Sequence, residues 1–287
     1  IKDSEGVTWF GTDGGLVRYA DDEFKTYTTK DGIPHKKILV LFEDVNGNIW
    51  LGTKNGATKF DGKNFTTFSR EQGLISDRVR AIDQDKNGDV WFGTSLGVSR
   101  FDGSKFQSFT EKNGLSNNRI RDIISDQDGN IWFGTYFGGI NRYSGDAFIH
   151  FSEDEGLRNE QVESVEITAD GVWVGTHDGA NRITDSNGKF IVHEDPFEGK
   201  LAGSTVYDIL QYEASTLFAT NRGIFRLKGK ILTQFELDGT LFNEEVHCLL
   251  KEDDHMWLGC GNGLYQISGT GDSWQTQEFY SQPNLNE

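Results

Sequence analysis

Hydrophobic and polar positions alternate over short distances along the whole chain. In the clearest stretch, residues 38–43 form an apolar run and residues 49–53 are mainly apolar, while residues 57–60 and 65–68 each combine two apolar and two polar side chains. Turn residues, mostly Gly, Asn and Asp, separate these segments. Apolar runs of this length between turn residues are typical of β-strands. The pattern therefore predicts four short antiparallel strands joined by tight turns.

This group of four strands recurs along the chain. The second strand of each group carries the sequence Trp-x-Gly-Thr, and five copies follow one another at a constant interval of 41 residues. Two degraded copies follow, with Leu217 and Trp257 in the position of the first Trp. The five regular copies begin at Trp9, Trp50, Trp91, Trp132 and Trp173. A period of about 40–45 residues with four strands per repeat is the signature of a β-propeller.

The sequence thus predicts an all-β fold, a seven-bladed β-propeller of four-stranded antiparallel blades that occupies residues 1–287 as a single domain. Ile1 aligns with Phe42, so the first repeat lacks most of its innermost strand. The C-terminal residues 283–287 match the approach to that strand. Because an open edge strand invites aggregation, we expect the two termini to join in one blade and close the ring. The predicted repeats are 1–34, 35–76, 77–116, 117–159, 160–203, 204–243 and 244–287.

Charge and composition exclude several classes of partner. With 45 Asp and Glu against 28 Lys and Arg, the net charge is -17, and no basic stripe is available to neutralise phosphates. We therefore expect no nucleic-acid partner, and no apolar run is long enough for this chain itself to insert into a membrane. The two cysteines, Cys248 and Cys260, are predicted as free, buried thiols on neighbouring strands, with His247 opposite Cys260 and Cys248 opposite Gly259.

Motifs for metals, cofactors and catalysis are missing from the sequence. The Asp-x-x-Gly turns lack the alternating acidic loop and closing Glu of a calcium site. The six histidines form no His-x-x-x-His pair, and no Gly-x-Ser-x-Gly nucleophile motif is present. We accordingly predict no catalytic residue, no metal and no cofactor.

The repeat resembles a known family. Its consensus reads Asp-x-x-Gly-Asn-Ile-Trp-Phe-Gly-Thr, followed by Gly, a hydrophobic residue and Arg, and is clearest in residues 44–62, 85–103 and 126–143. This pattern resembles the two-component regulator propeller repeat. The resemblance implies a seven-bladed propeller from the extracytoplasmic sensor region of a hybrid histidine kinase, often glycan-responsive. It also implies a periplasmic or extracellular location, whereas kinase activity does not carry over to this chain.

Positions that are alike in every repeat indicate scaffold. The Trp is expected to fill the gap between neighbouring sheets, and the Gly after it to allow strands to approach closely. Basic residues recur in one phase after the third-strand turn, where they are expected to bridge blades by pairing with turn aspartates such as Asp44, Asp85 and Asp126. A ring of ligand contacts is the alternative. These basic residues are Arg18, Lys59, Arg100, Arg142, Arg182 and Arg226.

Positions that vary between repeats are available for a site. Two loop sets, one between the second and third strands and one leading into the first strand, should open on the same face near the central channel. There, an arginine-rich sector suits an anionic group such as a uronate carboxylate or a sulfate, unless it pairs with Asp77, Asp83 or Asp122. Two adjacent aromatic rings suit sugar stacking or a protein contact, unless they pack on the next blade. The predicted ligand-binding residues are Arg78, Arg80, Arg119, Arg121, Tyr136, Phe137, Glu163, His177, Tyr207, Arg222 and His247.

The sequence therefore predicts a non-enzymatic ligand-sensing or interaction propeller, which binds a small molecule or an oligosaccharide at the channel face. Two other classes stay open. One is a scaffold that binds another protein through its loop face. The other is a polysaccharide lyase or hydrolase, in which Glu163, His177, Tyr207 and His247 would converge on the channel.

Overall fold

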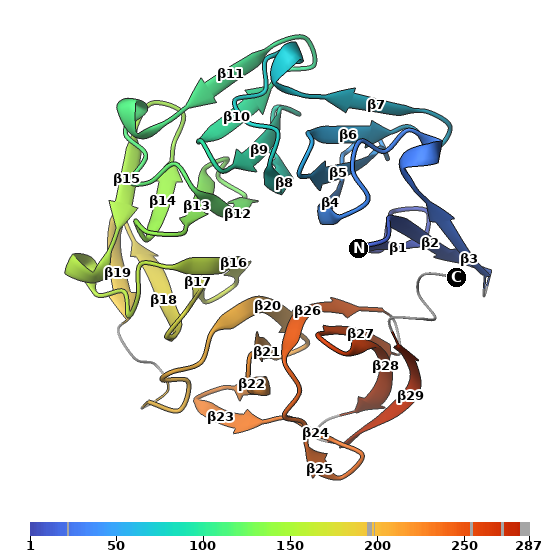
Figure 1. The fold of residues 1–287 in the computed structure, drawn as a ribbon. Coiled ribbons are helices and arrows are strands. Elements are labelled where there is room, and N and C mark those ends of the chain that lie inside the picture. Colours follow the sequence, from blue (N-terminus) through green and yellow to red (C-terminus); the bar gives the residue numbers. More distant parts are fainter. Residues whose placement is uncertain (22, 194–196, 198, 253–254, 271–272, 282–287) are drawn as a thin grey trace. The chain divides into compact units, whose positions relative to one another are not determined.

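The computed structural model describes residues 1–287 except 22, 194–196, 198, 253–254, 271–272 and 282–287. The chain forms two compact units, Ile1–His150 and Phe151–Glu287. Each unit is a succession of small antiparallel sheets, coloured blue to green in the first and yellow to red in the second (Figure 1).

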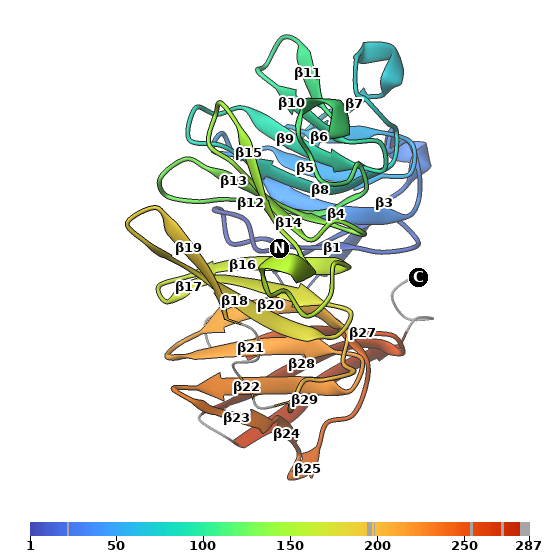
Figure 2. The ribbon, with the colours of Figure 1, turned by 90° about the vertical axis from the view of Figure 1, so that its left-hand side faces the viewer.

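The first unit contains a three-stranded sheet, β1-β2-β3, and three four-stranded sheets, each with its strands in sequence order. Figure 2 shows the strands of these sheets, in blue to green, as short ribbons. The strands are β1 (Thr8–Gly11), β2 (Leu16–Ala20), β3 (Glu23–Tyr27), β4 (Ile38–Glu43), β5 (Ile49–Thr53), β6 (Ala57–Phe60), β7 (Phe65–Phe68), β8 (Val79–Gln84), β9 (Val90–Thr94), β10 (Val98–Phe101), β11 (Phe106–Phe109), β12 (Ile120–Ser125), β13 (Ile131–Thr135), β14 (Ile140–Tyr143) and β15 (Phe148–Phe151).

The second unit contains two four-stranded sheets and a six-stranded sheet in the order β25-β24-β29-β28-β27-β26. The short hairpin β24–β25 was not predicted; it joins the last sheet through a parallel pairing of Leu237 with Trp274. The strands are β16 (Val162–Thr168), β17 (Gly171–Thr176), β18 (Gly179–Ser186), β19 (Lys189–His193), β20 (Val206–Tyr212), β21 (Ser215–Thr220), β22 (Gly223–Lys228), β23 (Ile231–Gln234), β24 (Glu236–Leu237), β25 (Thr240–Leu241), β26 (Val246–Lys251), β27 (His255–Cys260), β28 (Gly263–Thr270) and β29 (Ser273–Ser281).

Seven successive antiparallel blades confirm the predicted fold class, an all-β seven-bladed β-propeller. In the first blade, the Ile1 amino group donates to the Trp9 carbonyl at 2.9 Å, and the Trp9 N–H donates back to Ile1 at 2.7 Å. The N-terminal residues thereby begin a fourth strand next to β1. The closing contribution predicted from the C-terminal tail concerns residues 283–287, which lie outside the described residues.

In the first four blades the Trp of the repeat donates its indole N–H to an aspartate six residues earlier. The indole N–H of Trp91 donates to Asp85 Oδ2 at 2.9 Å, while Asp85 Oδ1 accepts backbone N–H groups of its own turn. The Trp91 side chain is 1% exposed and contacts Phe109 of its own blade and Phe133 of the next. The predicted role of the Trp between neighbouring sheets is thus confirmed for this pair of blades.

The predicted bridges from the recurring basic residues to the turn aspartates of another blade are wrong for Arg100 and Arg182. Arg100 Nε donates to Asp89 at 2.6 Å within the same blade, and the guanidinium carbon lies 5.7 Å from the Trp91 ring centroid. Arg182 likewise pairs with Asp170 of its own blade at 2.7 Å. The turn aspartates Asp44, Asp85 and Asp126 are already bound to an indole N–H and to turn backbone, while Arg100 and Arg182 pair with a carboxylate and stack on the Trp inside their own blades.

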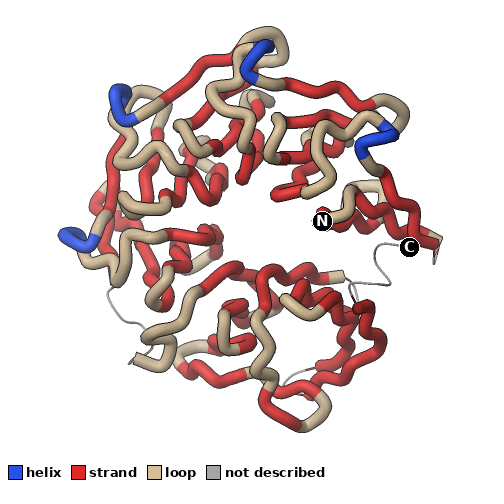
Figure 3. Tube along the Cα trace, viewed as in Figure 1, coloured by secondary structure: helices blue, strands red, loops and turns tan. Residues whose placement is uncertain are grey.

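Short 3-10 turns follow four of the outer strands and appear blue in Figure 3. Each begins after a Ser or Thr that forms a capping box and ends at a Gly in the left-handed region. They are η1 (Thr29–Asp31), η2 (Arg70–Gln72), η3 (Glu111–Asn113) and η4 (Glu153–Glu155).

The carboxylate of Asp208 on β20 connects two blades of the second unit. One oxygen accepts the Ile209 N–H at 2.9 Å, and the other accepts the Leu249 N–H of β26 at 2.7 Å. Desolvation is the largest effect on this group and raises the pKa of the Asp208 carboxyl to about 7. The native state consequently keeps this proton at pH values where the unfolded chain has lost it.

Stability should therefore fall as the pH rises from 5 to 7, because a raised carboxyl pKa favours the native state only while the group is protonated. We expect a loss on the order of 1 kcal/mol per pH unit from this group. Urea denaturation at both pH values should show that Asp208→Asn removes this part of the slope. Asp102→Asn is the control, because the Asp102 carboxyl has a pKa of about 2 and therefore titrates below pH 5. An Asp208→Asn slope equal to that of wild type would contradict the assignment.

Candidate functional site

Main-chain hydrogen bonds join the two variable loop sets within single blades. The Tyr136 N–H donates to the Arg119 carbonyl at 2.9 Å, and the His177 N–H donates to the Gln161 carbonyl at 3.0 Å. Asn221 and Gly261 make the corresponding bonds in the last two blades. The end of the second strand therefore lies beside the entrance to the first strand, as the sequence predicted.

Six innermost strands carry a register shift at the same place. In β8, Val79 pairs with Thr94 and Ala81 pairs with Gly93, so Arg80 is the extra residue of a β-bulge. A bulge disturbs the ladder locally and redirects the side chain that it carries. Five of the six bulge residues belong to the predicted ligand-binding set. The bulge residues are Leu39, Arg80, Arg121, Glu163, Tyr207 and His247.

In the first unit, the bulges of β8 and β12 border a hollow of about 200 Å³, which we call the basic hollow. Arg80 and Arg121 are half-buried at its bulges, and Arg78 and Arg119 are exposed just before the two strands. The structure thus brings all four predicted arginines together with Tyr136. The lining residues are Arg78, Arg80, Ser95, Arg119, Ile120, Arg121 and Tyr136.

Two of the carboxylates near these strands, Asp77 and Asp83, bind to backbone N–H groups. Asp77 accepts the Arg70 N–H at 2.8 Å, and Asp83 accepts the N–H groups of Gln84 and Ser125. Burial is the main cause of a raised pKa at Asp83. Across the described part of the chain, no carboxylate lies within ion-pair distance of the side chains of Arg78 or Arg119.

The two adjacent aromatic residues differ in their surroundings. The guanidinium carbon of Arg121 lies 4.1 Å from the Tyr136 ring centroid, a cation–π distance. The Phe137 ring meets the edge of Tyr136 at a centroid distance of 4.3 Å and is 48% exposed. Tyr136 therefore orients Arg121, while Phe137 presents an apolar ring to solvent.

The second unit gathers its own polar cluster at the bulges. His177 Nε2 lies 2.8 Å from Glu163 Oε1. The Tyr207 hydroxyl donates to Glu245 at 2.6 Å, and its ring lies 4.9 Å from that of His247. Desolvation, followed by the bond to Glu245, raises the pKa of Tyr207 to about 12, so the phenol is protonated at neutral pH. Glu245 was not among the predicted ligand-binding residues, although it directly precedes β26 as Arg119 directly precedes β12.

Arg222 has a local structural role. Its Nε donates to Ser204 Oγ at 2.8 Å, and its Nη2 lies 3.3 Å from the carbonyls of Lys200 and Ala202. It therefore holds the loop of residues 200–204 and does not join the cluster of Tyr207 and His247.

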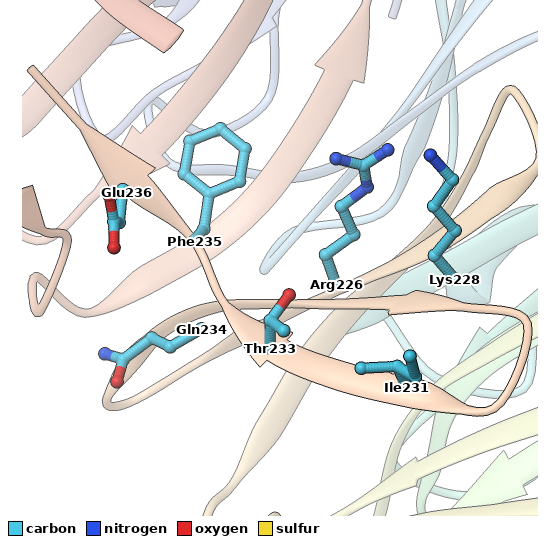
Figure 4. Close-up of a pocket in the computed structure, with 7 residues that line it drawn as sticks. All are labelled: Arg226, Lys228, Ile231, Thr233, Gln234, Phe235 and Glu236. Atoms are coloured by element: carbon cyan, nitrogen blue, oxygen red, sulfur yellow. The ribbon is translucent and has the colours of Figure 1, made fainter. Parts of the chain in front are cut away.

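A second hollow of about 450 Å³ lies beside the hairpin of β22 and β23 (Figure 4). The side chains of Arg226, Lys228 and Phe235 point to the same side of the hairpin in this view. Arg226 is 6% exposed and bonded to Ser215, and Phe235 packs against Trp274. None of the predicted ligand-binding residues lines this hollow.

Further features limit the chemistry of the described residues. They contain no group of three or more His, Cys, Asp or Glu arranged to hold a metal ion. Helices long and apolar enough to span a bilayer are likewise lacking in the described part. Both cysteines are free, and Cys248 lies opposite Gly259 as predicted. The predicted pairing of His247 with Cys260 is wrong, because the bulge at His247 leaves Val246 opposite Cys260. The predicted burial is wrong for the residues as a whole, because Cys248 is exposed and Cys260 is half-buried. The thiol groups themselves are desolvated, which raises the pKa of Cys248 to about 11 and that of Cys260 to about 12.

Comparison with known proteins gives one family match, in three stretches. Residues 32–55, 73–95 and 114–137 match the model of the two component regulator propeller. No curated protein matches the chain.

Solved structures show the same fold at low sequence identity. The extracellular domain of BT4673 from B. thetaiotaomicron, assigned to a one component system in one structure and to a hybrid two component system in another, is 21% and 22% identical, with a TM-score of 0.80 in both. The alignments cover 96% and 94% of this chain, but only 41% and 40% of those chains. A virginiamycin B lyase from Staphylococcus aureus, solved as a catalytically inactive variant with quinupristin, is 16% identical, with a TM-score of 0.69. That alignment covers 91% of this chain and 90% of the lyase.

Proposed function

We propose that this chain, three of whose repeats belong to the two-component regulator propeller family, is a ligand-sensing or interaction propeller without enzymatic activity. It would serve in the extracellular or periplasmic part of a two-component system. The matched repeats and the fold shared with extracellular domains of such systems support this proposal. The chain spans about two fifths of those domains, so signal output would depend on further parts of a longer protein.

The observation that carries the proposal is the series of bulges. The same position of six innermost strands is a bulge, yet its side chain changes from Leu through Arg and Glu to Tyr and His. A position that serves only the structure of the blade should keep the same residue type in every repeat, as the Trp-x-Gly-Thr positions largely do. Polar and aromatic side chains that vary at a fixed, redirected position suit recognition of an irregular ligand such as a small molecule or an oligosaccharide.

Thermal denaturation against an array of neutral and acidic oligosaccharides tests this function. A ligand that binds only the native state raises the free energy of unfolding, by about 2.7 kcal/mol at a hundredfold excess over Kd. For a ligand that shifts the melting temperature of the wild-type chain, substitution of bulge residues should reduce the shift. The variants are Arg80→Ala, Arg121→Ala and Tyr207→Ala. Lys105→Ala is the surface control, because Lys105 is exposed in the turn between β10 and β11 and lines neither hollow.

Failure of the whole array, together with capture of a protein partner that the same bulge variants abolish, would replace the ligand sensor by a protein-binding scaffold. A shift that persists in all three bulge variants would place the binding site elsewhere.

A glycan-cleaving activity is the second candidate, favoured by one observation. Glu163 contacts His177 and Glu245 contacts Tyr207, and such acid–base groups occur in lyases and hydrolases. The virginiamycin B lyase shares the fold at 16% identity, which does not transfer its chemistry. Mass spectrometry of any bound oligosaccharide after prolonged incubation should recover it intact. Cleavage products that disappear in Tyr207→Phe would establish an enzyme instead.

A further inference from the structure

We propose that the basic hollow binds an oxyanion, the carboxylate or sulfate group of an acidic saccharide. The inference rests on the proposed ligand-sensing function and specifies the class of ligand. It is based on the four arginines that line this hollow in the first unit.

The charge of the hollow is opposite to that of the protein. The chain has a net charge of -17, yet four of the seven residues that line this hollow are arginines and none is acidic. Guanidinium groups crowded into one hollow repel one another, more strongly where they are partly removed from water. A bound anion would remove this repulsion.

The arginines are arranged in two matching pairs. Arg78 and Arg80 lie two residues apart at the start of β8, and Arg119 and Arg121 lie two residues apart at the start of β12. In each pair the bulge residue is half-buried and the preceding residue is exposed. Two adjacent blades thus each supply one half-buried and one exposed arginine. The exposed arginines, Arg78 and Arg119, have no carboxylate partner among the described residues.

The lining residues fit oxyanion chemistry. A guanidinium presents N–H groups in a plane that matches two oxygens of a carboxylate or sulfate. Tyr136 fixes the Arg121 guanidinium by stacking at 4.1 Å, which lowers the entropy lost when it binds. Ser95 adds a hydroxyl to the lining.

The size of the hollow limits what enters it. Its volume of about 200 Å³ is below the roughly 300–1,000 Å³ of sites that enclose a whole small ligand. The hollow therefore suits one charged group with the sugar ring that carries it. The remainder of an oligosaccharide would lie outside, where Leu96 and Phe137 are 50% and 48% exposed beside the lining residues Ser95 and Tyr136.

Nuclear magnetic resonance titration of the full chain tests this inference with glucuronate, glucosamine 6-sulfate, inorganic sulfate and neutral glucose as probes. Charged probes should shift the amide signals of Arg78, Ser95, Ile120 and Tyr136, whereas glucose should leave them in place. The double variant Arg78→Gln/Arg119→Gln should weaken the affinity for the charged saccharides at least about tenfold. Raising the salt from about 0.05 to 0.3 M should weaken it further, because exposed charges are screened.

Arg70→Gln is the matched control, since Arg70 is an exposed arginine of the first unit outside the hollow. Its affinity should equal that of wild type. Stronger shifts with glucuronate would identify a uronate ligand, and stronger shifts with glucosamine 6-sulfate would identify a sulfated one. Signals that move equally with glucose, that do not move with any anion, or that respond equally in the double variant would overturn the inference.

The two proposals fail separately. If a neutral oligosaccharide stabilises the chain and its effect depends on Tyr207, while no anion shifts the signals of the basic hollow, the sensor proposal stands and the oxyanion inference falls. If inorganic sulfate binds but no saccharide does at any concentration tested, the inference that the hollow recognises an acidic saccharide is overturned.

Discussion

Replacing Trp91 by Ala should lower the free energy of unfolding by about 3–5 kcal/mol. The side chain is 1% exposed and fills the space between Phe109 and Phe133 of two neighbouring blades. Its removal leaves a cavity and also leaves Asp85 Oδ2 without the indole N–H that it accepts at 2.9 Å. Equilibrium denaturation followed by circular dichroism measures the loss.

The chain supplies its own comparison for this substitution. The sixth repeat has Leu217, 1% exposed, where the other copies have Trp. We therefore expect Trp91→Leu to cost less than Trp91→Ala, because Leu fills part of the cavity. Equal stability of Trp91→Ala and wild type would show that the Trp is not the packing unit between blades.

Gly52→Ala should destabilise the protein by about 1–3 kcal/mol, through crowding instead of a cavity. A Cβ at this position would lie 2.4 Å from Cγ1 of Val40 and 2.9 Å from the carbonyl oxygen of Val79. Val79 begins the innermost strand of the next blade, and its backbone cannot rotate away as a side chain can. Thermal and urea denaturation should both report the loss.

The reverse substitution is the control for Gly52. Ala219 of the sixth repeat stands at the same place in its blade, opposite Asp208, and is fully buried. Ala219→Gly should cost only about 1 kcal/mol, from backbone entropy. If Gly52→Ala left the unfolding transition unchanged, the close approach of adjacent blades at this Gly would be refuted.

The blades could be predicted from the repeat, because the strand positions had to agree when all seven copies were aligned. The strand β20 (Val206–Tyr212) is apolar enough to suggest a helix, yet its alignment with the other copies correctly predicted a strand. The bulges were not predicted. In the sequence, the extra residue Arg80 between Val79 and Ala81 continues the alternation of apolar and polar residues of a regular strand. The 3-10 turns had a readable signal, the capping box of Ser69 and Gln72, within a stretch interpreted only as a connection.

The site was predictable only as a set of positions. Comparing repeats showed that Arg80, Arg121 and Tyr207 occupy one phase, and the structure places them all at bulges. The partners of individual side chains could not be predicted. Arg222 binds Ser204 because of how one loop folds, and Tyr207 binds Glu245 across two blades, 38 residues apart.

The aspartate that accepts the indole N–H in the first four blades has an evolutionary consequence. In the first four blades it lies six residues before the indole that it accepts, at Asp3, Asp44, Asp85 and Asp126. A duplicated gene segment of one period therefore brings both partners of this bond, and a new copy needs no compensating change in its neighbours. In the seventh blade Glu252 replaces the aspartate at a spacing of five. Later copies can thus diverge one at a time, which frees their loops to acquire new specificities.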